Sequence, residues 1–323
     1  VATRPVVTVT RRLPAPVESA LAERFDVRLN RSDTPLDAAG LQEALATSDA
    51  VLCTVSDRLG AEVLGVEPLR ARLLANFGVG FEHINLDAAR ARGIAVTNTP
   101  GVLTEDTADL ALALMLMATR RLGEGERELR AGRWAGWHPM HHLGRRLSGK
   151  TLGVVGMGRI GRAVARRAVH GFGMRLLYAS RTELPAGEAA ALDAVHVEMD
   201  RVVAESDVVS LHVPLTAETR NILSAGRLAL LPRGAVVVNV SRGGLIDEPA
   251  LAQLVRSGHL FGAGIDTVAG EPAAADHVLR GEPARDWLSF WNDIYAQLAA
   301  GFAAGSARYA KPHADPSPAL PPE

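Results

Sequence analysis

The sequence predicts an α/β protein with two doubly wound parallel sheets. Its 323 residues are enough for about two domains, each with its own core. Short apolar runs alternate with segments of helical periodicity on both sides of residue 150, and this alternation is typical of parallel sheets with crossover helices. A glycine-rich turn at residues 156–161 stands between an apolar strand and an amphipathic helix in the second series.

The first series of elements lies before residue 100. Strands are expected at Val6–Val9, Val51–Val55, Leu73–Phe77 and Ile94–Val96. Helices are expected at Val17–Phe25, Leu41–Ala46 and Leu86–Arg92. A long apolar helix is then expected from Thr104 toward Arg130, followed by a loop rich in glycine, tryptophan and histidine. The later strands are expected at Leu176–Ala179, Val208–His212, Ala235–Val240 and Gly262–Ile265.

The glycine turn has the spacing of a dinucleotide-binding loop. Gly156 permits a tight turn, Gly158 lets the backbone approach a pyrophosphate, and Gly161 allows the helix to pack closely on the strand. A lone GxGxxG pattern is weak, but here the strand Leu152–Val155 precedes it and a helical pattern follows. The context predicts a Rossmann-like domain with the phosphates at the helix N-terminus.

Composition favours a soluble globular protein that acts on small molecules. Apolar residues make up 47% of the chain and the net charge is −1, which gives no electrostatic case for nucleic acid or an anionic membrane. The longest apolar stretch, Leu110–Ala118, is too short to span a bilayer, and we expect a cytoplasmic protein without a signal peptide. Cys53 is the single cysteine and is predicted to be a buried residue of a strand.

Six motifs together resemble the D-isomer-specific 2-hydroxyacid dehydrogenases, and within them the glyoxylate/hydroxypyruvate reductases. Besides the glycine turn they are 77–83, 97–104, 211–216, 239–247 and 262–272. The resemblance runs from about residue 5 to residue 279. It implies a substrate domain of flavodoxin type, split between residues 1–100 and about 285–310, into which a dinucleotide-binding domain (101–284) is inserted. Residues 311–323 are rich in proline and are expected to form a disordered tail.

The resemblance also assigns catalytic and substrate-binding roles. Reduction of a 2-oxo acid needs a cation that holds the carboxylate and polarises the carbonyl, and Arg242, directly after a strand, suits this role. The backbone N–H groups of Val79 and Gly80 match a second carboxylate contact. Glu271 matches the carboxylate that orients the catalytic histidine and raises its pKa. A homodimer is implied as well, although the periodicity of the helix after Thr104 fits a buried core helix equally well.

The cofactor contacts implied by the resemblance follow the ends of the strands of the second sheet. Asp266 matches the residue that orients the nicotinamide amide, with an Asp that caps a turn as the alternative. The whole set is Thr104, Gly156, Gly158, Arg159, Ile160, Gly161, Ser180, Arg181, Thr182, Val213, Pro214, Thr219, Val240 and Asp266.

The residues after the second strand of this domain favour NADP(H) over NAD(H). An NAD-specific site places an acid at this strand end to accept the ribose hydroxyls. Here Ser180, Arg181 and Thr182 offer a cation and two hydroxyls, which suit a 2′-phosphate. Glu183 is the counter-argument, because a shifted turn would present it to the ribose, and NAD(H) stays the alternative.

The sequence lacks the Pro-His-Ile-Gly-like segment in which the family carries its catalytic histidine. Counting along the family layout places that histidine near residues 289–291, which read Ser-Phe-Trp, and the family pattern stops at about Arg280. His277 and His313 are the candidates weighed for the acid. His138, His141 and His142 lie in the loop after the long helix, but no carboxylate or cysteine joins them in the sequence, so no metal site is predicted.

Two functions remain open at this point. The first is NADPH-dependent reduction of glyoxylate or hydroxypyruvate to the D-2-hydroxy acid. The second is a nucleotide-binding protein of the same fold with weak or lost catalysis, in a sensor or interaction role. A reading-frame or assembly error in the source sequence near Arg280 is a further explanation of the divergent C-terminal segment.

Overall fold

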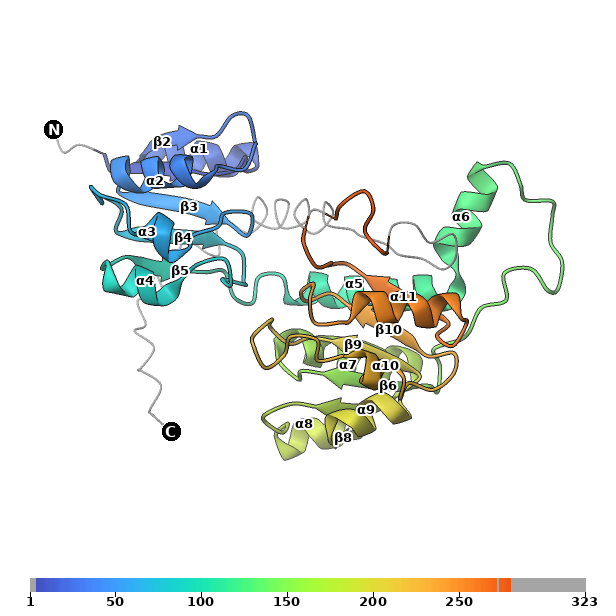
Figure 1. The fold of residues 1–323 in the computed structure, drawn as a ribbon. Coiled ribbons are helices and arrows are strands. Elements are labelled where there is room, and N and C mark those ends of the chain that lie inside the picture. Colours follow the sequence, from blue (N-terminus) through green and yellow to red (C-terminus); the bar gives the residue numbers. More distant parts are fainter. Residues whose placement is uncertain (1–3, 272, 280–323) are drawn as a thin grey trace. The chain divides into compact units, whose positions relative to one another are not determined.

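The computed structural model describes residues 4–271 and 273–279, which fall into two compact units, 4–100 and 101–279 (Figure 1). Each unit is built on one parallel sheet, so the predicted α/β class with two doubly wound sheets is confirmed. None of the described helices combines the length and apolar character that crossing a membrane requires. The predicted returning segment 285–310 and the predicted tail 311–323 lie outside the described residues.

The first unit contains a five-stranded parallel sheet of order β2-β1-β3-β4-β5. This order is the flavodoxin-like arrangement. The strands are β1 (Val6–Val9), β2 (Asp26–Leu29), β3 (Ala50–Thr54), β4 (Leu73–Phe77) and β5 (Ala95–Thr97). The helices are α1 (Ala15–Arg24), α2 (Ala38–Thr47), α3 (Ala61–Leu64) and α4 (Leu86–Ala91).

Helices cover both faces of this first sheet. On one face Leu41 and Leu45 of α2 pack with Val51, Cys53 and Leu74 of the central strands. The other face packs apolar residues of β1 against α1. Cys53 is fully buried, as predicted, and burial together with the nearby charge of Asp57 raises the pKa of its thiol to about 12. The thiol is therefore protonated and unreactive at neutral pH.

The second unit contains a six-stranded parallel sheet of order β11-β10-β9-β6-β7-β8. Read from the other edge, this is the 3-2-1-4-5-6 order of dinucleotide-binding domains, and the order reverses between β6 and β9. The strands are β6 (Thr151–Val155), β7 (Arg175–Ala179), β8 (Ala194–His196), β9 (Val208–Leu211), β10 (Val236–Asn239) and β11 (Gly262–Ile265).

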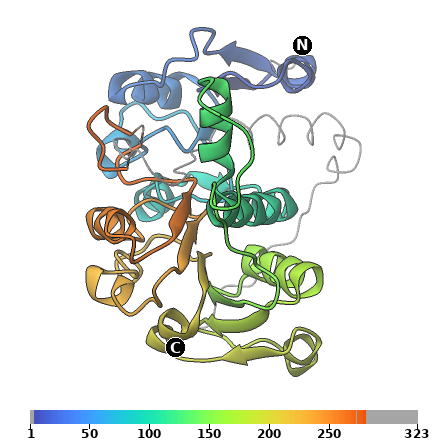
Figure 2. The ribbon, with the colours of Figure 1, turned by 90° about the vertical axis from the view of Figure 1, so that its right-hand side faces the viewer.

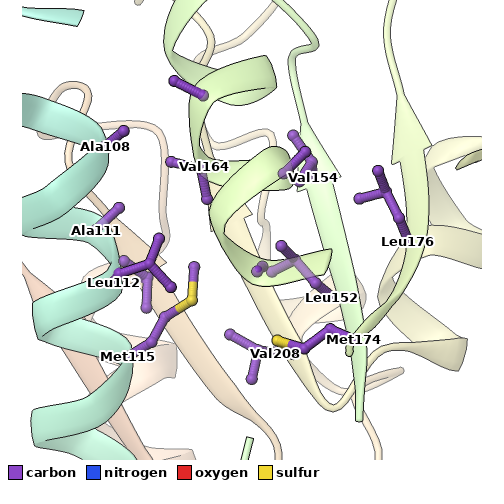
Figure 3. Packing of buried hydrophobic residues seen from close by; sticks show 14 of the residues in the cluster. Ala108, Ala111, Leu112, Met115, Leu152, Val154, Val164, Met174, Leu176 and Val208 are labelled. Carbon is purple, nitrogen blue, oxygen red and sulfur yellow. The ribbon is translucent and has the colours of Figure 1, made fainter. Parts of the chain in front are cut away.

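Helices pack on both faces of the second sheet as well. The first face carries α5 (Thr104–Arg120), α7 (Arg159–Phe172) and α8 (Ala186–Ala191), and the second carries α9 (Met199–Glu205), α10 (Ala225–Leu228) and α11 (Glu248–Arg256). Figure 3 shows Leu112 and Met115 of α5 packed toward Val164 of α7 and toward the strand residues Leu152 and Val208. The apolar stripe of α5 is thus part of this core.

The predicted long helix from Thr104 to Arg130 is wrong in one respect, because the structure breaks it at Arg121. Arg121 has a left-handed φ of 57°, and a separate helix, α6 (Leu122–Arg130), begins after it. The Arg121 guanidinium binds the Glu124 carboxylate in the first turn of α6, with Nη2 to Oε1 at 2.7 Å. Gly123 and Gly125 weaken the helical preference at this point. Helix α6 and the predicted loop after it project from the end of α5 (Figures 1 and 2).

Candidate active site

The glycine turn after β6 has the close contacts that the sequence predicts. Gly156 has a φ of 95°, and a Cβ atom there would lie 2.6 Å from the carbonyl oxygen of His212. A Cβ atom on Gly161 would lie 2.2 Å from the carbonyl oxygen of Gly156. Neither position has room for a side chain, because heavy atoms do not approach a Cβ this closely.

Gly158, between these two glycines, faces open space instead. A Cβ atom there would meet nothing within 4 Å, and Gly158 is the N-cap of α7 without a side-chain hydrogen bond to the helix. The first turn of α7 contains no acidic residue and begins with Arg159 and Ile160. The N–H groups and the positive end of this 14-residue helix therefore suit an anion such as the pyrophosphate of a dinucleotide.

The loop after β9 lies beside the glycine turn, at the point where the strand order reverses. His212 donates its N–H to the Val155 carbonyl at 2.7 Å, and the Cγ1 atom of Val213 lies 2.7 Å from the Cβ position of Gly156. Thr219 closes the loop by donating its hydroxyl to the Pro214 carbonyl at 2.6 Å. Val213, Pro214 and Thr219 thus line the switch point where open α/β sheets bind ligands.

The end of β7 carries an exposed cation. Arg181 and Thr182 are exposed and Ser180 is half-buried, and Arg181 forms no ion pair with the residues that the structure describes. The pKa of Glu218 is lowered, mainly by a hydrogen bond from Thr216 and to a lesser extent by the charge of Arg181. The guanidinium therefore lies near the loop after β9.

Glu183, which follows β7, contacts a histidine at the end of the neighbouring strand β8. Its carboxylate lies 3.3 Å from Nδ1 of His196, and Nε2 of the same ring lies 3.0 Å from the Ser180 carbonyl oxygen. The ring, at the end of β8, thus links the Glu183 carboxylate to the residue that follows β7.

Asn239, the last residue of β10, fixes the loop that carries Arg242. Its side-chain amide donates to the Arg242 carbonyl at 2.8 Å, and its side-chain oxygen accepts the Ser241 N–H at 3.1 Å. The Arg242 side chain folds back, with Nη1 donating to the Ser241 carbonyl at 2.7 Å. Because Asn239 is buried, the backbone under Arg242 is held rigidly.

The loop after β11 lies directly against the Arg242 loop. A Cβ atom on Gly243 would lie 2.0 Å from the carbonyl carbon of Val268, so the two loops touch through their backbones. Asp266 is buried and donates its N–H to the Asn239 carbonyl at 2.9 Å. The ends of β10 and β11 therefore bring Arg242 and Asp266 to one edge of the sheet. The remaining predicted positions are Val240, buried at the end of β10, and Thr104, the first residue of α5.

Glu271 forms part of the turn after β11. Its Oε1 accepts the N–H of Val268 at 2.9 Å. The expected position of its partner histidine, near residues 289–291, lies outside the described residues. The catalytic role of Glu271 therefore stays a prediction.

Val79 and Gly80 belong to the first unit, in the loop after β4. The Asn98 amide donates to the Val79 carbonyl at 2.8 Å, and the Asn76 amide donates to the Gly80 carbonyl at 2.8 Å. The N–H groups of Val79 and Gly80 donate to no other described residue. This loop thus presents N–H groups while its carbonyls are occupied, which suits an anion.

The histidines of the described part have distinct environments. Burial lowers the pKa of His212 to about 3, so at pH 7 its ring is the neutral imidazole and not the imidazolium that would serve as a general acid. His277 lies 3.0 Å from the Glu248 carboxylate, which also accepts the Ala269 N–H, and it anchors the segment after β11 to α11. His313 lies outside the described residues.

One expectation about the histidines is wrong. Glu128 of α6 contacts both His141 and His142, so a carboxylate does join the histidine-rich loop. The sequence alone does not show this contact, because Glu128 precedes the two histidines by 13 and 14 residues and the chain folds back to bring the three side chains together. Asn239 was missed as well, although it precedes Arg242 by three residues, because its role depends on backbone geometry.

Strand order, the glycine turn and the uncapped helix α7 define the second unit as a dinucleotide-binding domain. The family model "D-isomer specific 2-hydroxyacid dehydrogenase, NAD binding domain" matches residues 112–285. The chain is 43% identical to a glyoxylate reductase of Korarchaeum cryptofilum over 277 residues, which covers 85% of this chain and 82% of the relative. It is 40% identical to a glyoxylate reductase of Thermococcus litoralis over 273 residues, covering 83% and 82%.

A solved structure of a glyoxylate reductase from Paecilomyes thermophila aligns with a TM-score of 0.77 and 29% identity, covering 96% of this chain and 97% of that one. The chain belongs to the D-isomer-specific 2-hydroxyacid dehydrogenase family of NAD(P)-dependent enzymes.

Proposed function

We propose that the protein reduces a small 2-oxo acid, glyoxylate or hydroxypyruvate, to the D-2-hydroxy acid with NADPH. The observation that carries this proposal is the braced Arg242 loop, which lies at the same sheet edge as the glycine turn. The similarity to glyoxylate reductases supports the choice of substrate.

Each of these residues has its own role in the proposed reaction. The nicotinamide cofactor supplies the hydride when bound. The N–H groups at the start of α7 hold its pyrophosphate, and Asp266 orients its amide. Arg242 would bind the substrate carboxylate and polarise the carbonyl that receives the hydride, and the alkoxide formed would take its proton from water. The N–H groups of Val79 and Gly80, which donate to no other described residue, stay the predicted second contact for a carboxylate.

The preference for NADPH rests on the end of β7. Arg181 is exposed, and Ser180 and Thr182 flank it with hydroxyls. Glu183, the residue that would favour NAD, is paired with His196. A 2′-phosphate at this strand end would meet a cation and two hydroxyls, while the Glu183 carboxylate lies 3.3 Å from Nδ1 of His196.

A homodimer is the second part of the proposal. Nine large apolar side chains are exposed in the described part, and six of them lie on α6 and the loop after it. They are Leu122, Leu129, Trp134, Trp137, Met140 and Leu143. An apolar surface of this kind is typical of a protein–protein interface.

A nucleotide-binding protein with weak catalysis is the second candidate function. The observation that favours it is Glu271, which accepts a backbone N–H in its own turn, in a sequence without the family's Pro-His-Ile-Gly segment. General acid catalysis contributes about 10²- to 10⁴-fold, so without a histidine the reaction would be slow but would still respond to Arg242.

The cofactor preference is tested by steady-state kinetics with glyoxylate and either NADPH or NADH. We expect a lower KM for NADPH, and we expect Arg181→Gln to raise this KM about ten- to a hundredfold because a charge-assisted hydrogen bond is lost. The KM for NADH should change little. Arg175→Gln, at the start of β7 and so at the opposite end of this strand from the Arg181 turn, is the control. A lower KM for NADH in the wild type would overturn the NADPH assignment.

A further inference from the structure

Three side chains with metal-binding atoms converge where the loop after α6 folds back onto that helix. They are Glu128 of α6 and His141 and His142 of the loop. The Nε2 atom of His141 lies 2.9 Å from Oε2 and 3.1 Å from Oε1 of the Glu128 carboxylate. The Nε2 atom of His142 contacts the same Oε2, and one ligand atom from each residue lies within 4.8 Å of the other two.

The donor set is that of a borderline transition metal. Two imidazole nitrogens and one carboxylate oxygen suit Zn²⁺ and similar divalent transition metals, whereas Ca²⁺ and Mg²⁺ prefer sites made of oxygen ligands alone. Ligand atoms bound to Zn²⁺ at about 2.0 to 2.1 Å in a tetrahedron are about 3.3 Å apart. The separations of 2.9 and 3.1 Å between His141 and Glu128 are close to this spacing.

The surroundings of the cluster favour a cation. The Glu128 carboxylate lies against both rings and supplies the one acidic group of the cluster. The three side chains are each 23 to 24% exposed, so they are mostly covered by protein but remain accessible from solvent. The ring of His138 stacks on that of His141, with the centroids 5.0 Å apart, and this restricts the orientation of His141.

We propose that Glu128, His141 and His142 bind one Zn²⁺ ion. The ion fastens the loop after α6 to the helix and so fixes the segment that carries the exposed residues Trp134, Trp137 and Met140. Its role is structural and separate from the proposed reduction, which needs no metal. Cys53 does not compete for the ion, because its thiol is fully buried and protonated.

Metal binding is tested on the full chain without a histidine tag, after treatment with a chelator and dialysis. Titration with Co²⁺ followed by visible absorption, and with Zn²⁺ by competition, should give one bound ion per chain. Glu128→Gln and His142→Gln should each lower the affinity at least about tenfold, since even loss of an outer-shell partner has this effect. His170→Gln replaces an exposed histidine outside the cluster and should leave binding unchanged.

Hydrogen exchange locates the ion without any substitution. Zn²⁺ added to the wild-type chain should slow exchange in residues 124–146 and leave the rest of the described chain unchanged. Binding well below one ion per chain, equal affinity in Glu128→Gln and wild type, or protection elsewhere would each overturn the proposal. NADPH binding, measured in parallel, should be the same with and without Zn²⁺, so that failure of this proposal is distinguishable from failure of the proposed enzyme.

Discussion

His212 shows at the scale of a single residue how position determines chemistry. Its ring lies at the end of β9, where Nε2 and the Ser210 hydroxyl are 2.8 Å apart and Nδ1 is buried. The sequence places this histidine at the end of an expected strand, whereas the low pKa follows from its burial in the structure. The neutral ring fits a contact in the wall of the site better than the role of acid.

The depressed pKa of His212 makes stability dependent on pH. The folded state has a pKa of about 3 at this residue, whereas the unfolded chain takes up the proton near pH 6.5. Between these values the unfolded state binds more protons, so the free energy of unfolding falls as the pH falls below about 6.5. Urea unfolding at pH 7.5 and 5.0 measures this fall.

His212→Gln should reduce the loss of stability between these two pH values, and the exposed His170→Gln should not. If His212→Gln and the wild type lose the same stability, the ring is not held neutral in the folded protein.

The glycine turn and α7 act as one element. Gly161 has no room for a Cβ atom, whereas Gly171 in the same helix has nothing within 4 Å of its Cβ position. Gly161→Ala should force the turn away from the helix, destabilise the protein by about 1 to 3 kcal/mol and weaken NADPH binding at least about tenfold. Gly171→Ala should stabilise the helix by about 0.5 to 1 kcal/mol and leave NADPH binding unchanged.

Thermal unfolding and fluorescence titration with NADPH measure both effects. Equal NADPH affinity in the two variants would remove the glycine turn from the proposed site.

The sequence predicted the strands that form short apolar runs and missed two strands that do not. The central strands are short apolar runs bounded by turns, and such runs are easily recognised in a sequence. The edge strands β2 and β8 were not predicted because they are partly exposed and lack such a run. The break at Arg121 was also missed, although Gly123 and Gly125 lower the helical preference just after it, because the apolar pattern before it predicts a continuous helix.

The sequence likewise predicted some residues of the site and missed others. Glycines, Arg242 and Asp266 stand in motifs at strand ends, so sequence order alone placed them at one edge of a sheet. The brace from Asn239 and the approach of Glu128 to the two histidines depend on how the chain folds back, which composition and spacing do not encode.

At the scale of the whole molecule, the exposed apolar surface of α6 and its loop predicts a dimer. Trp137 is 82% and Leu129 is 62% exposed, and this exposure of apolar side chains to water is unfavourable unless another surface covers them.

Leu129→Glu should shift the protein toward the monomer, because a charge would then be buried in the interface. Leu230→Glu, at an exposed apolar position outside this surface, should not. Sedimentation velocity separates the two outcomes, and a wild-type monomer at micromolar concentration would contradict the dimer.

The most direct test of the proposed reduction is the loss of NADPH absorbance with glyoxylate or hydroxypyruvate, measured for the wild type and Arg242→Ala. We predict turnover by the wild type and a decrease in kcat/KM of about 10²- to 10³-fold in Arg242→Ala, with the Kd for NADPH unchanged. Tight NADPH binding without reduction of either acid by the wild type would contradict the proposal and favour a nucleotide-binding protein without this activity.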